Sequence, residues 1–400
     1  MTEERLKIAF LSGPANAAEI YREWSNAEAQ VYFGTDYLKQ FLQVASDLDA
    51  ESYVVTWYGN ELGVTKLGSF TFDNRPVTSA GGARYYLAQL LWHLRLLPTL
   101  LRFRPDILML TGNQNFWWTL APVRWLGAKI VISYHAVLWP QFRPVKKSWR
   151  FLLELNRIFI LRHAKGILST SRDIRGQIEQ LLGRDKDRVP IFDHLPTYSP
   201  AQFADISPPD DLPRRPFRTF FMSRIEENKG VFDIVEIARS LEAERPGEYR
   251  FEICGRGGAL SALRERVADL GLEDVVMCHG FSSPEKVSEL MSASHVCIVP
   301  TRTNYEAGFE MTCSEAILAA RPLVTSAVCP ALDYLRDASV EAKPDDPASY
   351  REAIVKLSDE PELYASKQRA CSGLQEQFYD RGNSWYSAMR RALDPYARKR

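Results

Sequence analysis

One segment constrains the fold more than any other: Pro300-Thr-Arg-Thr-Asn-Tyr-Glu-Ala-Gly-Phe-Glu-Met-Thr-Cys-Ser-Glu-Ala-Ile-Leu-Ala-Ala-Arg-Pro-Leu-Val-Thr-Ser326. The apolar run Val296–Val299 before it is typical of a buried parallel strand. A helix is expected to begin near Phe309 and to stop at Arg321, since the proline that follows disfavours a helical residue before it. With a strand from Leu323, the segment predicts one βαβ unit. The start of its helix offers unpaired backbone N–H groups to an anion such as phosphate.

Short apolar runs of the same kind recur along the chain and alternate with helical stretches. The predicted strands are residues 7–12, 52–57, 106–111, 129–134 and 166–170 in the first half, and 218–222, 251–254, 275–278, 296–299 and 323–324 in the second. The alternation predicts an α/β protein of two doubly wound parallel sheets covered by helices. Residues 199–216 are rich in proline and indicate a linker. The expected organisation is a Rossmann-like domain at 1–198, the linker at 199–216, a second Rossmann-like domain at 217–378 and a helix within 379–400 that packs across both domains.

The composition is that of a globular protein of two domains, with 46% hydrophobic and 25% charged residues in 400. The start Thr2–Lys7 is charged and does not resemble a signal peptide, and no apolar run approaches the roughly 18 residues of a membrane helix. We therefore expect a cytoplasmic protein. The six cysteines form no CxxC pair and are expected to be buried free thiols, and the six histidines show no zinc spacing.

The formal net charge is zero, but the charge is unevenly distributed. Between Arg75 and Arg188 there are 19 Lys and Arg against 6 Asp and Glu, and six of the nine tryptophans lie in the same segment. Two helical stretches in it, residues 84–97 and 149–162, are open to two interpretations. Each could be a core helix with a cationic edge, or each could dock on an anionic membrane surface or an anionic acceptor. Nucleic acid is not expected as a partner, because no known binding module is present.

Two cations mark a candidate anion site in the second half. Arg224 follows the strand 218–222, and Lys229 directly precedes the helical stretch that starts near Val231. An arginine fork matches phosphate oxygens in two directions and lysine adds a compact charge, so the pair suits a diphosphate. The alternative is two solvated surface cations.

Three further patterns remain ambiguous on sequence grounds. The turn Gly255-Arg256-Gly257 lacks the full GxGxxG spacing, so it is either a tight turn or a loop that lets a nucleotide approach the backbone. His135 ends the strand 129–134 and could donate to a sugar hydroxyl or be a hydrogen-bonded core histidine. Asp47-Leu-Asp49 is a DxD pattern, but its place in a turn favours capping over metal binding.

The second half resembles the donor domain of the retaining glycosyltransferases of family 4, which have the GT-B fold of two Rossmann-like domains facing across a cleft. The similarity covers roughly Arg218 to the C-terminus, and the first half is similar in outline. The motifs that carry it are Arg224–Gly230, Ile253–Gly257, His279-Gly-Phe281, and Gly308-Phe309 followed by Glu315-Ala316. Each is common alone, but their order and spacing together are specific.

The resemblance implies a role for each matching position. Arg224 and Lys229 would bind the donor diphosphate, and Glu315 would hold the ribose hydroxyls. Residues that would line the donor are Gly308, Phe309, Glu310, Gly255, Arg256, Gly257 and Phe281. His135 would lie near the transferred sugar, and either Gly13 or Gly34 would supply the glycine loop under the donor.

One position departs from the family pattern. The acidic residue that usually precedes the Gly-Phe pair is replaced by Ala307, and Glu306 comes one residue earlier. Either the loop brings Glu306 or Glu310 inward, or the recognition of the sugar differs. We count Glu306 with Arg224, Lys229 and His135 as the residues expected to act in catalysis.

The resemblance therefore implies a retaining, metal-independent transferase without a cofactor, which moves a sugar from a UDP- or GDP-type donor to a glycan or lipid-linked acceptor in cell-surface polysaccharide synthesis. Peripheral contact with an anionic membrane surface on the cytoplasmic face is one expectation from the basic segment. Two alternatives stay open: a non-hydrolysing sugar-nucleotide epimerase, and a catalytically silent nucleotide-sugar binder, which Ala307 suggests.

Overall fold

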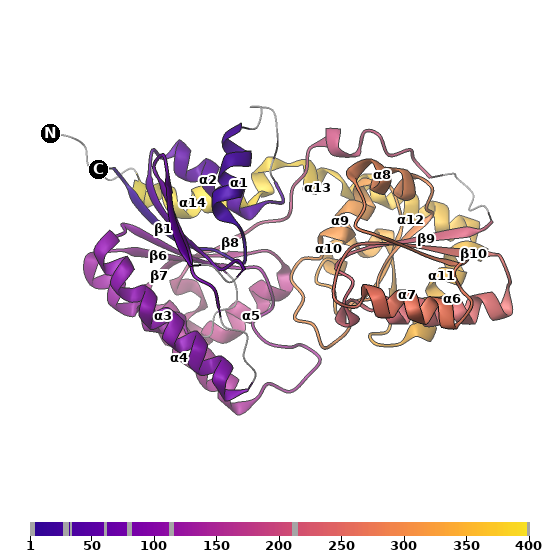
Figure 1. The fold of residues 1–400 in the computed structure, drawn as a ribbon, viewed down its shortest axis with the longest axis horizontal. Coiled ribbons are helices and arrows are strands. Elements are labelled where there is room, and N and C mark those ends of the chain that lie inside the picture. Colours follow the sequence, from indigo (N-terminus) through magenta and orange to yellow (C-terminus); the bar gives the residue numbers. More distant parts are fainter. Residues whose placement is uncertain are drawn as a thin grey trace. The chain divides into compact units, whose positions relative to one another are not determined.

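The computed structural model describes residues 5–26, 32, 34–59, 62–77, 82–111, 116–209 and 215–397. The chain divides into two compact units, each with its own sheet (Figure 1). The first unit holds residues 1–139, 145–198 and 381–400, and the second holds residues 140–144 and 199–380. The predicted class, two parallel α/β domains, is confirmed.

The first unit is built on an eight-stranded sheet. Its strands, in spatial order, are β3 (Gly63–Leu67), β4 (Phe70–Asn74), β2 (Glu51–Thr56), β1 (Lys7–Leu11), β5 (Ile107–Thr111), β6 (Lys129–Tyr134), β7 (Ala164–Ser169) and β8 (Ile191–Asp193). All neighbouring pairs are parallel except β3 and β4, which form an antiparallel hairpin at the edge. The sequence did not predict this hairpin, because β3 is largely exposed and lacks a continuous apolar run. The very short β8 was missed as well.

Helices cover both faces of this sheet, as Figure 1 shows. On one face lie α1 (Ala17–Asn26), α2 (Tyr37–Asp47) and α14 (Trp385–Ala397); on the other lie α3 (Ala83–Phe103), the 3-10 helix η1 (Trp117–Leu126), α4 (Lys147–His163) and α5 (Arg172–Leu182). Asp36 caps α2 by accepting from the Lys39 N–H. In the described part of the chain, no helix is both long and apolar enough to cross a membrane.

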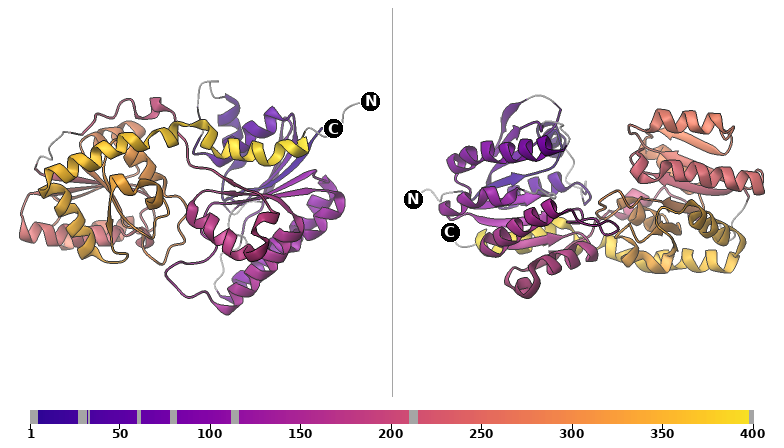
Figure 2. Two further views of the ribbon diagram at one scale, coloured as in Figure 1. Left: turned by 180° about the vertical axis from the view of Figure 1, so that it is seen from behind. Right: turned by 90° about the horizontal axis from the view of Figure 1, so that it is seen from below.

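The second unit contains a six-stranded parallel sheet. Its spatial order is β11 (Val276–Gly280), β10 (Tyr249–Cys254), β9 (Phe217–Met222), β12 (Val296–Val299), β13 (Leu323–Ser326) and β14 (Ser339–Ala342). Its helices are α6 (Val231–Glu244), α7 (Leu260–Asp269), α8 (Pro284–Ser292), α9 (Met311–Leu318), α10 (Leu332–Leu335), α11 (Pro347–Asp359), α12 (Pro361–Leu374) and α13 (Glu376–Tyr379). All six cysteines are free, and five of them are buried. Helices lie on both sides of the strands (Figure 2).

The helix of the βαβ segment is shorter than the sequence predicts. It runs over Met311–Leu318 instead of starting near Phe309 and reaching Arg321. Ala320 takes a positive φ of 56°, which ends the helix before the proline is reached. The Arg321 side chain is buried and donates to the carbonyls of Ser292 and Ser294, so it joins the loop before β12 to the end of this helix.

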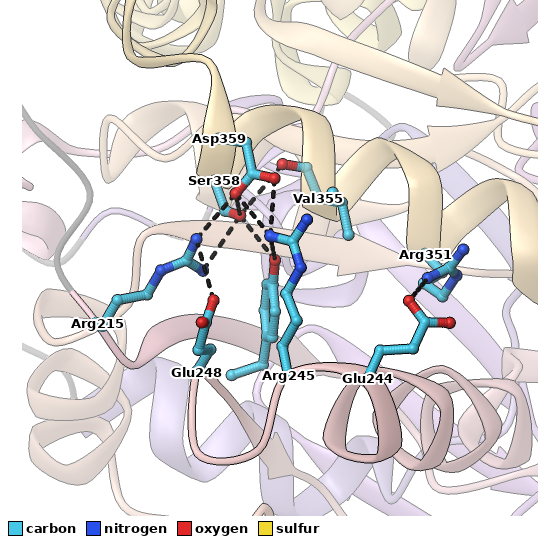
Figure 3. Close-up of polar contacts among 9 residues, drawn as sticks. Arg215, Glu244, Arg245, Glu248, Arg351, Val355, Ser358 and Asp359 are labelled. Atoms are coloured by element: carbon cyan, nitrogen blue, oxygen red, sulfur yellow. Dashed lines mark hydrogen bonds and ion pairs between the residues drawn. The ribbon is translucent and has the colours of Figure 1, made fainter.

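A network of ion pairs holds the C-terminal end of α11 next to the segment that precedes β9 (Figure 3). The Asp359 carboxylate accepts from Arg215 at 2.8 Å and from Arg245 at 2.7 Å. Burial raises the pKa of Asp359, but hydrogen bonds from Arg245, Ser358 and Arg215 outweigh it, so the pKa lies below its usual value. The network joins the segment before β9 to the ends of α6 and α11.

The segment 379–400, for which the sequence predicts a helix across both domains, is divided between the units. Helix α13 ends at Tyr379 in the second unit, and residues from Arg381 onward belong to the first. Helix α14 packs against α2, β6, β7 and β8, and its Trp385 and Met389 are fully buried in the core there. Of the predicted linker, residues 199–209 and 215–216 are described and belong to the second unit.

Candidate functional site

The strand order of the second unit reverses between β9 and β12. The chain leaves these neighbouring strands through two loops at their carboxyl ends, residues 223–230 and 300–310. In open parallel sheets, ligands bind at this reversal, outside the carboxyl ends of the strands. Six of the predicted site residues lie on these two loops: Arg224, Lys229, Glu306, Gly308, Phe309 and Glu310.

Tyr305 brings the two predicted cations together. Its hydroxyl accepts a hydrogen bond from the Arg224 guanidinium at 3.1 Å, and the Lys229 ammonium lies 3.8 Å from the centre of its ring. Arg224 is exposed and also donates to Glu226 at 2.7 Å. The two cations therefore face one aromatic side chain, and Arg224 remains exposed to solvent.

Lys229 is buried in an ion pair. Its Nζ donates to Glu310 Oε1 at 2.8 Å, and its side chain is 5% exposed. Glu310 directly precedes the first residue of α9 and is the N-cap of that helix. The pair fixes the ammonium beside the N-terminus of α9, where backbone N–H groups favour negative charge.

Arg302 connects the loop 300–310 to the loop 223–230 and to α6. Its backbone N–H donates to the Asn228 carbonyl at 3.0 Å, and its side chain forms an ion pair with Asp233 in α6 at 2.9 Å. Below them, the Thr312 hydroxyl donates to the Met222 carbonyl at the end of β9, at 2.6 Å. The positions of Arg224 and Lys229 relative to α9 are thus set by several contacts of the backbone.

Gly255 and Gly257 lie where their turn packs closely on the loop that carries Arg224. A Cβ at Gly255 would lie 1.8 Å from the Ser223 carbonyl oxygen, and one at Gly257 would lie 2.3 Å from that of Ile225. Only glycine allows the turn to pack on the backbone of residues 223–225. The adjacent Arg256 guanidinium lies 5.1 Å from the centre of the Phe281 ring, which is 75% exposed. The turn thus supports the loop that carries Arg224.

The loop 300–310 shows how Ala307 is accommodated. Ala307 is buried, so a carboxylate there would be withdrawn from solvent, whereas the preceding Glu306 is partly exposed. Burial nevertheless raises the pKa of Glu306. Gly308 is partly exposed, and Phe309 packs edge-on against Tyr334 and Phe378. Phe309 is therefore held by the core of the second unit.

Glu315 lies in α9, separately from the ion pair of Lys229 and Glu310. Its side chain is partly exposed, while its neighbours Ser314 and Ala316 are fully buried. The expectation that it binds ribose hydroxyls stays a prediction.

The first unit has a cavity at its own point of strand reversal, between β1 and β5. The cavity measures about 620 Å³. Its lining includes residues at or just after the carboxyl ends of four strands, namely Gly13, Trp57, Thr111 and His135. Nothing lies within 4 Å of a Cβ built on Gly13, so the glycine leaves open space there. Gly34 does not line this cavity. It packs on the backbone of Thr197, because a Cβ built on Gly34 would lie 2.1 Å from the Thr197 carbonyl oxygen.

His135 is held by an aromatic cluster in the first unit. Its Nε2 lies 3.0 Å from Ser133 Oγ, which also accepts from the Trp385 indole N–H at 2.9 Å. The ring packs on Tyr37 with centroids 4.1 Å apart, and lies 5.9 Å from His194. Burial lowers the pKa of His135 to about 4, so the imidazole is neutral at pH 7.

The DxD pattern is engaged in contacts between elements. Asp47 accepts from the Tyr386 hydroxyl at 2.5 Å, and Asp49 pairs with Arg5 at 2.8 Å. Among the residues that the structure describes, no group of three or more His, Cys, Asp or Glu side chains is arranged to hold a metal ion.

Sequence reasoning assigned no role to three residues that organise these places. Tyr305 joins Arg224 to Lys229, while Tyr37 and Trp385 surround His135. Tyr305 lies in the segment that fixed the fold, so its position after β12 was a usable signal. Trp385 lies 250 residues from His135 in the chain, and no sequence pattern linked the two.

Two family models match the chain in succession. Residues 40–192 match the family described as Glycosyltransferase Family 4, and residues 203–370 match the family described as Glycosyl transferases group 1. The chain belongs to these GT-B glycosyltransferases, which confirms the resemblance at the level of the family, while retention at the anomeric carbon stays a prediction.

Individual relatives are distant. The chain is 28% identical over 251 residues to an alpha-D-kanosaminyltransferase from Streptomyces kanamyceticus, covering 60% of this chain and 64% of that protein. It is 27% identical over 119 residues to the amylovoran biosynthesis glycosyltransferase AmsK from Erwinia amylovora, covering 29% of each. These matches span less than two thirds of either relative.

Among solved structures, the chain is similar to HepE from Anabaena, which was crystallised with UDP and glucose. The TM-score is 0.64, the sequence identity is 14%, and the match covers 98% of this chain and 99% of that one. A likeness at this identity shows the GT-B fold alone.

Proposed function

We propose that this protein transfers a sugar from a nucleoside diphosphate sugar to a glycan or lipid-linked acceptor, with retention at the anomeric carbon and without a metal ion. The observation that carries the proposal is the convergence of Arg224 and Lys229 on Tyr305 beside the N-terminus of α9. A diphosphate bound there would meet two cations and a helix N-terminus. These are the groups that stabilise negative charge as a diphosphate departs.

The roles of the two cations follow from their surroundings. The Lys229 side chain is already buried and held by Glu310, so it loses little further conformational entropy when its ammonium binds a phosphate oxygen. The Arg224 side chain is exposed, and its guanidinium is hydrogen-bonded to Glu226. Its N–H groups can therefore reorient toward a phosphate that arrives from solvent. Positive charge at this site would balance the leaving diphosphate, which is the role a divalent metal has in other transferases.

The acceptor is assigned to the first unit. Its cavity holds a neutral imidazole, His135, which can donate to or accept from a hydroxyl at pH 7. Trp57 and Tyr37 offer aromatic surface beside it. Retention is taken from the resemblance to family 4. The similarity to a protein named for amylovoran biosynthesis supports a polysaccharide acceptor, and with it a cytoplasmic location where nucleotide sugars are made.

A thermal-shift screen tests the donor site. The purified protein is melted with UDP, GDP or ADP and with their sugars, and a ligand that binds only the folded state raises the Tm. We expect one base to give a shift that is lost in Lys229→Ala and kept in Lys356→Ala, a matched change at an exposed lysine of α11. A shift that survives in Lys229→Ala would contradict the proposed diphosphate site.

Turnover separates the proposal from its alternatives. The donor identified by the screen is incubated with the protein, and the release of nucleoside diphosphate is followed with and without oligosaccharide acceptors. Release that depends on an acceptor, with the anomeric configuration of the product kept in NMR spectra, supports a retaining transferase. Conversion of the nucleotide sugar without an acceptor would indicate an epimerase, and binding with neither transfer nor slow hydrolysis would indicate a silent binder.

A further inference from the structure

Helix α3 carries an apolar stripe that is open to solvent. The stripe follows alternating steps of four and three residues, which place its members on one face of a helix. Its members, called here the leucine stripe, are Leu87, Leu91, Leu94, Pro98 and Leu101. All are exposed, and Leu87 reaches 56%.

The leucine stripe is not the face by which α3 joins the core. Leu96 and Leu100 are fully buried in the core of the first unit, and His93 is buried as well. At 3.6 residues per turn these three lie on the side of the helix opposite the stripe. The helix therefore has two apolar faces, of which the protein itself covers one.

The charge beside the stripe has a single sign. Arg84, Arg95 and Arg102 are exposed, and their spacing places all three on the same flank of the leucine stripe. The sequence Ala83–Phe103 contains no Asp or Glu. An apolar face flanked only by guanidinium groups is complementary to apolar chains that lie under anionic headgroups.

Neighbouring elements continue this character. Both α3 and α4 pack against η1, and they run along the same edge of the unit in Figure 1. Trp125 at the end of η1 is 79% exposed, next to the exposed Arg124. On α4, Phe151 is exposed beside Arg150. Tryptophan and arginine together are typical of the interface between lipid and water.

We propose that the leucine stripe and the arginines beside it dock the first unit on an anionic lipid bilayer, with α3 lying in the plane of the interface. A helix of 21 residues is roughly 30 Å long, so the stripe presents an extended line of contact. A polar macromolecule would leave four leucines in water, and a neutral apolar partner would leave the arginines unused. The inference does not depend on sugar transfer, because docking is measured without a donor.

Vesicle binding by the whole protein tests the inference. The probes are vesicles of phosphatidylcholine with and without phosphatidylglycerol, sedimented at low and at about 0.15 M salt. Stronger binding to the anionic vesicles is expected. Arg95→Gln/Arg102→Gln should weaken it about fivefold for each arginine removed, and Leu91→Gln/Leu94→Gln about tenfold for each leucine.

Matched controls lie in the same unit but outside α3, η1 and α4. Leu62→Gln/Val64→Gln changes two exposed apolar residues at the edge of the sheet, and Arg22→Gln/Lys66→Gln removes two exposed cations. Neither control should alter vesicle binding. Because all these positions are exposed, each variant should melt within a few degrees of the parent.

Three results would overturn the inference. One is equal binding to neutral and anionic vesicles, and another is equal loss in the controls and in the stripe variants. In the third, the parent protein binds neither kind of vesicle and is a dimer by light scattering, and Leu91→Gln/Leu94→Gln is a monomer. That result would show that a second copy covers the leucine stripe.

Discussion

The Lys229 ammonium donates to the Glu310 carboxylate at 2.8 Å, and both side chains are largely removed from solvent. Each charge would be costly without the other. The ion pair thus links the loop after β9 to the start of α9. A phosphate that binds Lys229 would add to this pair, because an ammonium has three N–H groups to donate.

This pair predicts that stability and donor binding separate. Lys229→Met should lower turnover about 100-fold by removing a cation at the diphosphate. It should also destabilise the fold by about 3 kcal/mol, because Glu310 is left buried without a partner. In Lys229→Met/Glu310→Gln most of the stability should return while turnover stays low. Urea unfolding and donor hydrolysis measure the two effects, and a double variant that regains activity would exclude Lys229 from the donor site.

Tyr305 should act by orienting Arg224. Tyr305→Phe removes the hydroxyl that accepts from the guanidinium at 3.1 Å but keeps the ring beside Lys229. We expect a loss of about threefold to tenfold in donor affinity, the size of one hydrogen bond. Tyr305→Leu, which removes the ring as well, should lose more. Equal affinities for the parent and both variants, measured by calorimetry with the nucleotide found by the screen, would show that Arg224 needs no orientation.

Glu306 should destabilise the fold at neutral pH. Burial raises the pKa of Glu306 in the folded state above the ordinary value of 4.5, so folding opposes the ionisation of this carboxyl group. The stability of the fold therefore falls as the pH rises from 4.5 through the raised pKa. Glu306→Gln should therefore raise the Tm at pH 7 by a degree or so and leave it unchanged at pH 4.

If Glu306 replaces the carboxylate displaced by Ala307, the same variant should lose most of its transfer activity. A gain in stability together with a loss of activity is expected when a residue that destabilises the fold is needed for function. A variant that is more stable and fully active would remove Glu306 from the site.

Three histidines with lowered pKa values should make the protein acid-sensitive. Burial lowers the pKa of His93, His135 and His194, that of His135 to about 4. The unfolded chain takes up protons near pH 6.5 while the folded protein does not. The stability is therefore complete above pH 6.5 and is lost as the pH falls toward 4. Thermal melts across this range should show a falling Tm, with a shallower slope in His194→Gln. A Tm independent of pH between 6.5 and 4 would contradict the burial of these neutral rings.

The sequence predicted the strands that contain a short continuous apolar run and missed those that lack one, which are β3, β4, β8 and β14. β6 and β12 are short apolar runs without interruption, which periodicity detects. The edge strand β3 is exposed and contains Thr65 and Lys66, so it resembles a loop in sequence. The sequence signal is weak at the rim of a sheet because burial there is only partial.

The sequence predicted site residues that lie close together in the chain. It did not predict contacts between loops that are distant in the chain. Arg224 and Lys229 were identified because each flanks a strand or a helix. The reason for Gly255 lies in the backbone of Ser223, 32 residues earlier in the sequence, and no pattern in the chain shows that approach. For α3, spacing identified apolar positions but could not show which of its two apolar faces the protein covers.

The return of α14 to the first unit affects how the protein is made. The core around Phe10 and Phe41 is completed by Trp385, which is synthesised after the whole of the second unit. During translation the second unit can close its own sheet while the first still exposes apolar surface on β1 and α2. The N-terminal unit is thus the first to leave the ribosome and the last to finish folding. Until Trp385 arrives, that surface is available to a chaperone or to misassembly with a neighbouring nascent chain.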